Sequence, residues 1–183
     1  TGTRQPATGA TFQNGKNLLD WDNGDTLELP SALYSIPNGD NTLFMVGLHD
    51  SSAVNDYYIG MTESGGGRYY YRADTTAANI RVVNRTSDAN AVIISSDEDV
   101  LQIGTFIRDG VNQSVSINGG AFSTNTLALS ESGIDAAHIG SKAGAGSFLR
   151  GSIAEIIIYN RALSTAEQTL VRAYLSNKWS VSL

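Results

Sequence analysis

Residues 148–167 read FLRGSIAEIIIYNRALSTAE, and this stretch carries the strongest structural signals in the chain. The apolar run at residues 152–159 predicts a buried strand, because β-branched and aromatic side chains pack well on a pleated surface. Ser164 and Glu167 form a capping box, in which each side chain accepts a hydrogen bond from the backbone N–H of the other residue. The stretch therefore predicts a core strand followed directly by a helix.

Upstream of this stretch, short β-type runs alternate with Gly, Asn, Asp and Ser, and no helical period is sustained over three turns. The clearest hairpin joins residues 114–117 to residues 121–123 through Asn118-Gly119, and Asn14-Gly15, Asn23-Gly24 and Asn38-Gly39 mark further turns. The eleven candidate strands are residues 17–21, 26–29, 42–49, 56–61, 68–72, 79–84, 91–95, 100–108, 113–118, 136–139 and 152–159. Strands without intervening helices predict an all-β fold of two packed antiparallel sheets.

The predicted helix starts at Ser164 and runs for about three to four turns. Leu170 and Tyr174 recur at helical spacing, and Lys178 lies toward the end of the helix, where the helix dipole favours a cation. We expect the helix to lay Leu170 and Tyr174 on the edge of the sandwich, with Trp179 as a further contact.

Composition points to one domain over residues 1–183, because 183 residues bury a sizeable core without extra cross-links. The absence of cysteine excludes disulfides, Cys-ligated zinc and thiol catalysis. A pI near 4.7 argues against general nucleic-acid binding, which needs a surplus of Lys and Arg. No apolar run approaches the ~18 to 20 residues of a membrane span, so we expect no membrane insertion.

Three segments together resemble the C-terminal signature of laminin-G-like domains in the concanavalin A-like superfamily. These segments are residues 139–142 (IGSK), residues 148–164 and residues 174–179 (YLSNKW), and residues 19–30 are similar to the family's first hairpin. The resemblance implies a jelly-roll sandwich with one short C-terminal helix. It leaves function open, because this sandwich hosts lectins, glycan-binding modules, glycosidases and adhesion domains.

Catalysis has little support in the sequence. The glycosidases of this fold carry a Glu-x-Asp-x-Glu or Glu-x-Asp-x-x-Glu run on one strand, and no such run occurs in this chain. The acidic residues 97–99 follow two serines between apolar runs, which favours a solvated turn. His49 and His138 are isolated, and neither is accompanied by an activated nucleophile, so we expect no enzyme.

Two acidic loops offer hard oxygen ligands of the kind that calcium prefers. The alternative is a pair of ordinary turns with solvated acids, and the spacing alone leaves both interpretations open. The candidate calcium ligands are Asp20, Asp22 and Asp25 in the first loop, and Asp50 and Asp56 in the second.

Arginine and tyrosine concentrate in residues 68–72 (RYYYR) and 81–85 (RVVNR). Period-two alternation in a hairpin places side chains of both segments on one exposed sheet face. Such a face stacks a sugar on a tyrosine and pairs acidic glycans with guanidinium groups, whereas the alternative is a solvated outer face. The candidate glycan-binding residues are Arg68, Tyr70, Arg72, Arg81 and Arg85.

Two classes of function fit these observations. The first is a non-catalytic binding module that recognises a glycan or cell-surface ligand through rim loops or the Arg/Tyr face. The second is a structural or attachment component of a larger assembly, such as a phage tail or head-decoration protein, with neighbouring virion proteins as partners. A divergent glycosidase is the third hypothesis. The first two imply an extracellular, secreted or virion-surface location.

Overall fold

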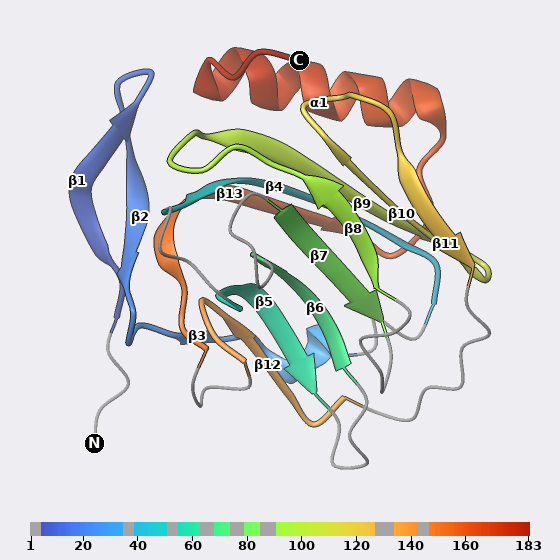
Figure 1. Ribbon diagram of the computed structural model, residues 1–183, viewed down its shortest axis with the longest axis horizontal. Helices are drawn as coiled ribbons and strands as arrows, with labels where there is room; N and C mark the ends of the chain where they lie inside the picture. Colours follow the sequence, from blue (N-terminus) through green and yellow to red (C-terminus); the bar gives the residue numbers. More distant parts are fainter. Residues whose placement is uncertain are drawn as a thin grey trace.

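The computed structural model describes residues 5–34, 39–50, 55–62, 68–73, 79–84, 91–126, 134–142 and 147–183, with the backbone alone at residues 68–70, 83 and 84. These residues form two antiparallel sheets that pack face to face, with one helix across the outside (Figure 1). The predicted all-β, two-sheet sandwich with a C-terminal helix is therefore confirmed. Within the described residues, no helix has the length and apolar character needed to cross a membrane.

The larger sheet has seven strands. In spatial order they are β1 (Ala7–Gln13), β2 (Lys16–Asp22), β13 (Arg150–Tyr159), β4 (Asn41–His49), β9 (Gln102–Asp109), β10 (Asn112–Ile117) and β11 (Ser123–Thr126). The predicted strand at residues 152–159 is β13, which lies between β2 and β4 although it is the last strand in the sequence. Strand β1 was not predicted, since most of its side chains are exposed and its sequence, ATGATFQ, lacks an apolar alternation.

The smaller sheet has six strands, in the order β3 (Leu27–Glu28), β12 (Ala136–Ile139), β5 (Tyr57–Thr62), β6 (Arg68–Ala73), β7 (Asn79–Asn84) and β8 (Val92–Ser95). A short 3-10 helix, η1 (Ser31–Leu33), follows β3. Each predicted strand overlaps an observed one. The short apolar runs and the turn residues between them therefore predict the positions of these strands correctly.

Two Asn-Gly pairs adopt the backbone that the sequence predicts. Asn14 and Gly15 have φ angles of 48° and 70°, and Asn118 and Gly119 have φ angles of 48° and 73°. These positive angles close tight hairpins between β1 and β2 and between β10 and β11. The second turn is closed by a hydrogen bond of 2.9 Å from the Gly120 N–H to the Ile117 carbonyl.

The main core lies between the sheets. Met45 and Phe106 on the larger sheet face Tyr71 and Val82 on the smaller one, and all four side chains are buried. Gly104 on β9 lies directly under the Tyr71 hydroxyl, where a Cβ atom would overlap that oxygen. The close approach of the two sheets at this point therefore depends on a glycine.

The helix α1 (Thr165–Trp179) covers the outer face of the seven-stranded sheet, as Figure 1 shows. Its N-terminus carries the predicted capping box between Ser164 and Glu167, with both reciprocal hydrogen bonds present. The predicted packing is wrong for Leu170, which is 72% exposed, partly right for Tyr174, which is 48% exposed but donates to Glu155 on β13, and right for Trp179, which is buried. The buried stripe is instead Gln168, Arg172, Leu175 and Trp179, which follows the same helical period but starts at a polar residue.

Candidate functional site

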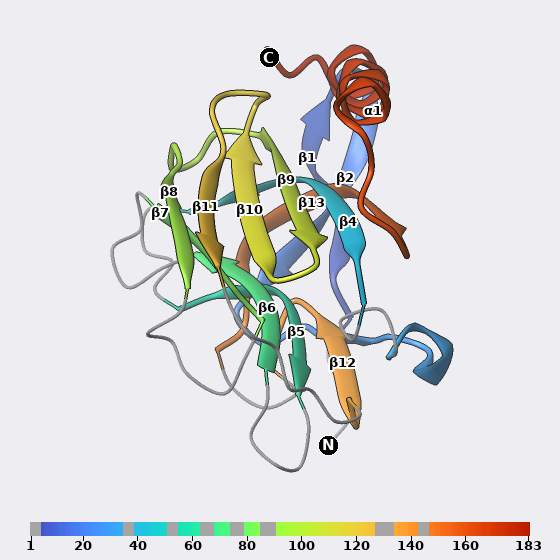
Figure 2. The same cartoon turned by 90° about the vertical axis from the view of Figure 1, so that its right-hand side faces the viewer.

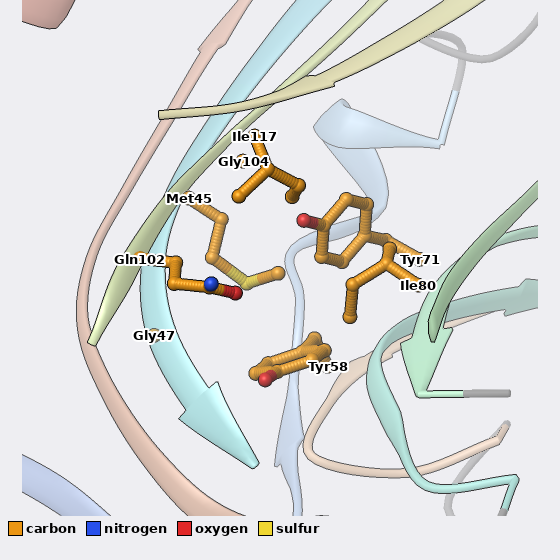
Figure 3. A pocket seen from close by; sticks show the side chains of 8 residues that line it. All are labelled: Met45, Gly47, Tyr58, Tyr71, Ile80, Gln102, Gly104 and Ile117. Carbon is orange, nitrogen blue, oxygen red and sulfur yellow. The ribbon is translucent and has the colours of Figure 1, made fainter. Parts of the chain in front are cut away.

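The space between the sheets contains a cavity of about 10 Å³, which is close to the volume that a single water molecule needs. Figure 3 shows Tyr58 and Tyr71 from the smaller sheet and Met45 and Gln102 from the larger one around this space. A sugar ring does not fit there. Three regions of the surface contain side chains that a ligand could use.

The first region is the hairpin groove, which Asp20, Trp21, Asp22 and Asp25 line with Ala10, over a volume of about 460 Å³. The structure thus brings the three aspartates of the first predicted calcium loop to one surface groove. Asp25 is buried, and its carboxylate accepts a hydrogen bond of 3.3 Å from the Asp22 N–H. The contact stabilises a turn, but the hairpin interpretation is wrong, because the turn leads from β2 in the seven-stranded sheet to β3 in the six-stranded sheet.

Asp20 is held within the sheet. Its carboxylate accepts hydrogen bonds from the backbone N–H groups of Ala10 and Thr11, at 3.2 and 3.1 Å, and from the Ser152 hydroxyl at 2.7 Å. Burial raises the pKa of Asp20, but the hydrogen bonds from Thr11 and Ser152 outweigh burial, and the pKa is lowered overall. Across the described residues, no group of three or more acidic or histidine side chains is arranged to hold a metal ion.

Asp56, in the second predicted calcium loop, forms a two-pronged ion pair with Arg150. The Arg150 Nε and Nη2 atoms lie 2.8 and 3.1 Å from its two carboxylate oxygens, and the Arg150 backbone N–H donates a third bond at 3.1 Å. Hydrogen bonding to Asp56 raises the pKa of Arg150. Asp50 lies close by, and its N–H donates to the Arg150 carbonyl at 3.1 Å. Both oxygens of Asp56 are thus engaged in structural contacts, while residues 51–54 lie outside the described residues.

The second region is the arginine row, by which we mean the candidate arginines of β6 and β7 and the residue that follows β7. The register of β6 and β7 sets Arg72 opposite Arg81 and Tyr70 opposite Val83, as the predicted hairpin requires. The expectation that Arg72 is exposed is wrong, because its side chain is only 3% exposed. Its guanidinium carbon lies 5.7 Å from the centre of the Tyr57 ring, a cation–π contact from the neighbouring strand β5.

The other members of this candidate site are only partly described. Arg81 is half-buried, whereas the side chains of Arg68 and Tyr70 and the whole of Arg85 lie outside the described residues. Sequence alternation predicts which side chains share a face, but it does not show which side chain of an adjacent strand, here Tyr57 on β5, packs against them. The structure therefore supports the register of the predicted Arg/Tyr face and corrects the exposure of its best-described member.

The acidic residues 97–99 and the two histidines have the structural contacts that the sequence predicts for a turn and for strand positions. Residues 98–99 form a turn, and Asp97 accepts a hydrogen bond of 3.2 Å from the Gln102 side-chain amide. His49 is buried at the end of β4, and its Nδ1 atom lies 3.0 Å from the Tyr58 hydroxyl. His138 lies opposite Glu28 in the smaller sheet, and burial lowers the pKa of its ring although Glu28 opposes this effect.

The third region, which the sequence did not reveal, is the helix groove. It has a volume of about 590 Å³ and lies between the outer face of β9, β10 and β11 and the first turn of α1. Figure 2 shows the three strands side by side, with α1 above them. The groove-lining side chains with hydrogen-bonding or aromatic chemistry are Asp109, Asn112, Ser114, Phe122, Thr124 and Gln168.

The sequence shows one face of the helix groove but not its wall. Ser114 and Phe122 lie on the two arms of the predicted hairpin, and Asn112 and Thr124, just beyond its predicted ends, continue the spacing of side chains that share one face. The hairpin was predicted, but its polar face gave no reason to expect a groove, because the wall of that groove comes from a helix about 40 residues further along the chain.

Comparison with known proteins identifies the fold. No protein-family model and no curated protein matches the sequence. Among solved structures, the chain is similar to Trypanosoma rangeli sialidase in complex with 2,3-difluorosialic acid (TM-score 0.66, 19% identity, 93% of this chain and 28% of the sialidase). It is also similar to the NanB sialidase of Streptococcus pneumoniae in its K499G form (TM-score 0.62, 19% identity, 86% of this chain and 27% of the sialidase).

A third match is the receptor-binding domain of the botulinum neurotoxin C/D mosaic serotype, with a TM-score of 0.71 and 12% identity over 92% of this chain and 45% of that chain. The chain has the concanavalin A-like fold. It spans just over a quarter of the length of the two sialidases and less than half of the toxin chain. At such low identity the concanavalin A-like match establishes architecture, and function has to be argued from the surface regions described above.

Proposed function

We propose that this chain is a non-catalytic laminin-G-like domain that binds a glycan on an extracellular, secreted or virion surface. The observation that carries the proposal is the helix groove, whose volume of about 590 Å³ falls within the range of small-molecule sites. Its hydroxyl, amide and carboxylate groups can each bond to the hydroxyls of a sugar. The concanavalin A-like fold, shared with two sialidases and a toxin receptor-binding domain, supports the same class of function.

The absence of catalysis is part of the proposal. The sequence lacks the Glu-x-Asp-x-Glu run with which glycosidases of this fold place two carboxylates in one cleft. Two of the better-described aspartates, Asp20 and Asp56, are engaged by backbone N–H groups and by Arg150 respectively. A carboxylate held in this way is stabilised as a hydrogen-bond acceptor and is poorly suited to donate a proton.

A glycan array tests the proposed function. The chain is screened with calcium and again with EDTA, and binding that is retained in EDTA is the expected result, since the described aspartates do not form a metal cluster. Binding that is lost in EDTA would indicate that the glycan binds through calcium at the acidic loops around Asp22 and Asp50. Absence of binding under both conditions would contradict glycan recognition and favour the assembly function.

One observation favours that second function. Leu170 on α1 is a large apolar side chain that is 72% exposed, and Tyr174, one turn further along, is 48% exposed although its hydroxyl donates to Glu155 on β13. Exposed apolar surface on adjacent turns of a helix is typical of a surface that contacts another protein, such as a neighbouring subunit in a virion. Light scattering coupled to size-exclusion chromatography would detect self-association, and Leu170→Glu should abolish it if this surface is responsible.

A further inference from the structure

We infer that the helix groove binds a neutral saccharide, with Phe122 as the stacking platform and the paired side chains of β10 and β11 as its hydrogen-bonding floor. This inference rests on the proposed function, and it adds the location of the site and the chemical class of the ligand.

The geometry of the hairpin builds a continuous strip. Ser114 pairs with Thr124 and Asn112 pairs with Thr126 across β10 and β11, so these side chains project from the same face of the sheet. Phe122 lies two residues before Thr124 and lines the same groove. From Phe122 to Thr126 the strip spans four residues, or roughly 13 Å of extended chain, which is long enough for an oligosaccharide.

The hydrogen-bonding groups of the strip suit sugar hydroxyls. The Ser114 and Thr124 hydroxyls lie 2.8 Å apart, and the Thr126 hydroxyl donates to the Asn112 side-chain carbonyl at 3.1 Å. Each of these bonds uses only part of the capacity of its groups, because a hydroxyl has one donor and two acceptor sites and an amide has two of each. The pairs are therefore held in place while they still offer donors and acceptors to a ligand.

Phe122 supplies the apolar part of the site. Phe122 is 39% exposed at the end of the strip, and its side chain contains only carbon and hydrogen. The C–H face of a pyranose ring can cover such an aromatic surface and remove it from water, while the sugar hydroxyls point toward the strip. An aromatic ring beside convergent polar groups is the usual composition of a small-ligand site.

Charge selects the class of sugar. Asp109 is exposed on β9 and lines the groove, and no lysine or arginine is present among the described residues that line it. A carboxylate accepts hydrogen bonds from sugar hydroxyls but repels the carboxylate or sulfate of an acidic glycan. The groove therefore favours neutral sugars, in contrast to the arginine row on the other sheet.

The helix end serves as a wall, and its polar groups are already used within the protein. The Gln168 side-chain amide donates to the Leu163 carbonyl at 2.7 Å, and the Ser164 hydroxyl takes part in the capping box. The Leu163 N–H also donates to the Thr42 hydroxyl on β4 at 3.0 Å, which ties the start of α1 to the sheet, so the width of the groove is set before a ligand arrives. A preformed site avoids much of the ordering cost of binding.

The test is an NMR titration of the ¹⁵N-labelled full chain with lactose, maltotriose, cellotriose and chitotriose, with sialyllactose as the acidic counterpart of lactose. We expect at least one neutral sugar to shift the amide signals of Ser114 and Thr124, and we expect Phe122→Ala to weaken that sugar about tenfold. Thr124→Val, which keeps the strand but removes one hydroxyl, should weaken it several-fold. Phe12→Ala is the matched control, since Phe12 is a 62% exposed phenylalanine outside the groove and its loss should leave affinity unchanged.

The outcomes separate this inference from the proposed function. Sugar-induced shifts confined to the arginine row or to the hairpin groove would overturn the neutral-saccharide site and leave glycan binding intact. Equal affinities of the Phe122→Ala and Phe12→Ala variants for the neutral sugar would also overturn the neutral-saccharide site and leave glycan binding intact. Absence of shifts with all five sugars would overturn the groove assignment, and absence of any signal on the glycan array would overturn the proposed function as well.

Discussion

The carboxylate of Glu155 on β13 accepts a hydrogen bond of 2.7 Å from the indole Nε1 of Trp179 near the end of α1. Tyr174 and Lys178 donate to the same carboxylate, at 3.2 and 2.9 Å. One acidic side chain thus ties three residues of α1 to the seven-stranded sheet. Residues 148–164 and 174–179, two of the segments that led to the expectation of a laminin-G-like domain, meet at this carboxylate.

Glu155→Gln tests this contact. Burial raises the pKa of Glu155, but hydrogen bonds from Trp179 and Lys178 outweigh burial and lower the pKa overall. A lowered pKa means that the carboxylate stabilises the fold above its unfolded-state pKa, and that this contribution is lost as the pH falls through the folded-state value. We expect the free energy of unfolding of the variant to be about 1 kcal/mol lower than that of the wild type at neutral pH.

Urea titrations of both proteins at neutral and acidic pH measure this effect. The two free energies of unfolding should converge as the pH falls, because the wild-type carboxylate is then neutral as well. A difference that stays constant with pH would show that Glu155 contributes through packing alone.

Asp56→Asn is expected to destabilise the fold by about 2 kcal/mol. The change removes the charge that pairs with Arg150, whose side chain is partly exposed, so the loss should fall below that of a fully buried ion pair. Thermal unfolding measures the loss, and Asp22→Asn on the exposed end of β2 is the matched control. Equal stability of the two variants would contradict a structural role for Asp56.

Gly104→Ala should destabilise the fold by roughly 1–3 kcal/mol, because the added methyl group overlaps the Tyr71 hydroxyl. Tyr71→Phe removes that hydroxyl, so the double variant should recover part of the loss. The measurement is a double-mutant cycle of unfolding free energies. Strict additivity of the two changes would show that the overlap is relieved elsewhere.

Much of the architecture could be predicted because the signals are local. Asn118-Gly119 and the Ser164–Glu167 capping box each act over a few residues, and both were predicted correctly. The errors share a different cause. Arg72 is buried by Tyr57 of another strand, and the packing face of α1 is chosen by a sheet whose strands are distant in the sequence.

The candidate sites also show this difference between local signals and contacts made by distant segments. The sequence could place Asp20, Asp22 and Asp25 near one another because they lie within six consecutive residues, and the structure places them on one groove. It could not show that Ser152 on β13 engages Asp20, or that α1 turns a polar hairpin face into a groove. Such relationships arise only from tertiary packing.

Calcium is expected to leave stability unchanged. A ligand that binds only the folded state raises the melting temperature by mass action, and the described aspartates form no cluster that could produce this effect. Differential scanning calorimetry in calcium and in EDTA provides the measurement. A calcium-dependent increase in the melting temperature that disappears in the Asp22→Asn variant would show that the first acidic loop is a metal site.

Ser164→Ala should lower the free energy of unfolding by about 1 kcal/mol through the lost helix cap. Ser182→Ala provides the comparison, since Ser182 is an exposed serine beyond the helix. Thermal unfolding of the two variants side by side measures the difference. Identical melting temperatures would mean that packing of α1, and not its cap, determines when the helix unfolds.

The position of β13 between β2 and β4 has a consequence for synthesis in the cell. A ribosome makes the two neighbours of this strand long before the strand itself, so the seven-stranded sheet has to remain open at its middle until residues 150–159 emerge. During that interval the edges of β2 and β4 are unpaired, and unpaired strand edges promote aggregation. Folding of this sandwich should therefore wait until β13 has emerged, and chains that stop before β13 should accumulate as insoluble protein.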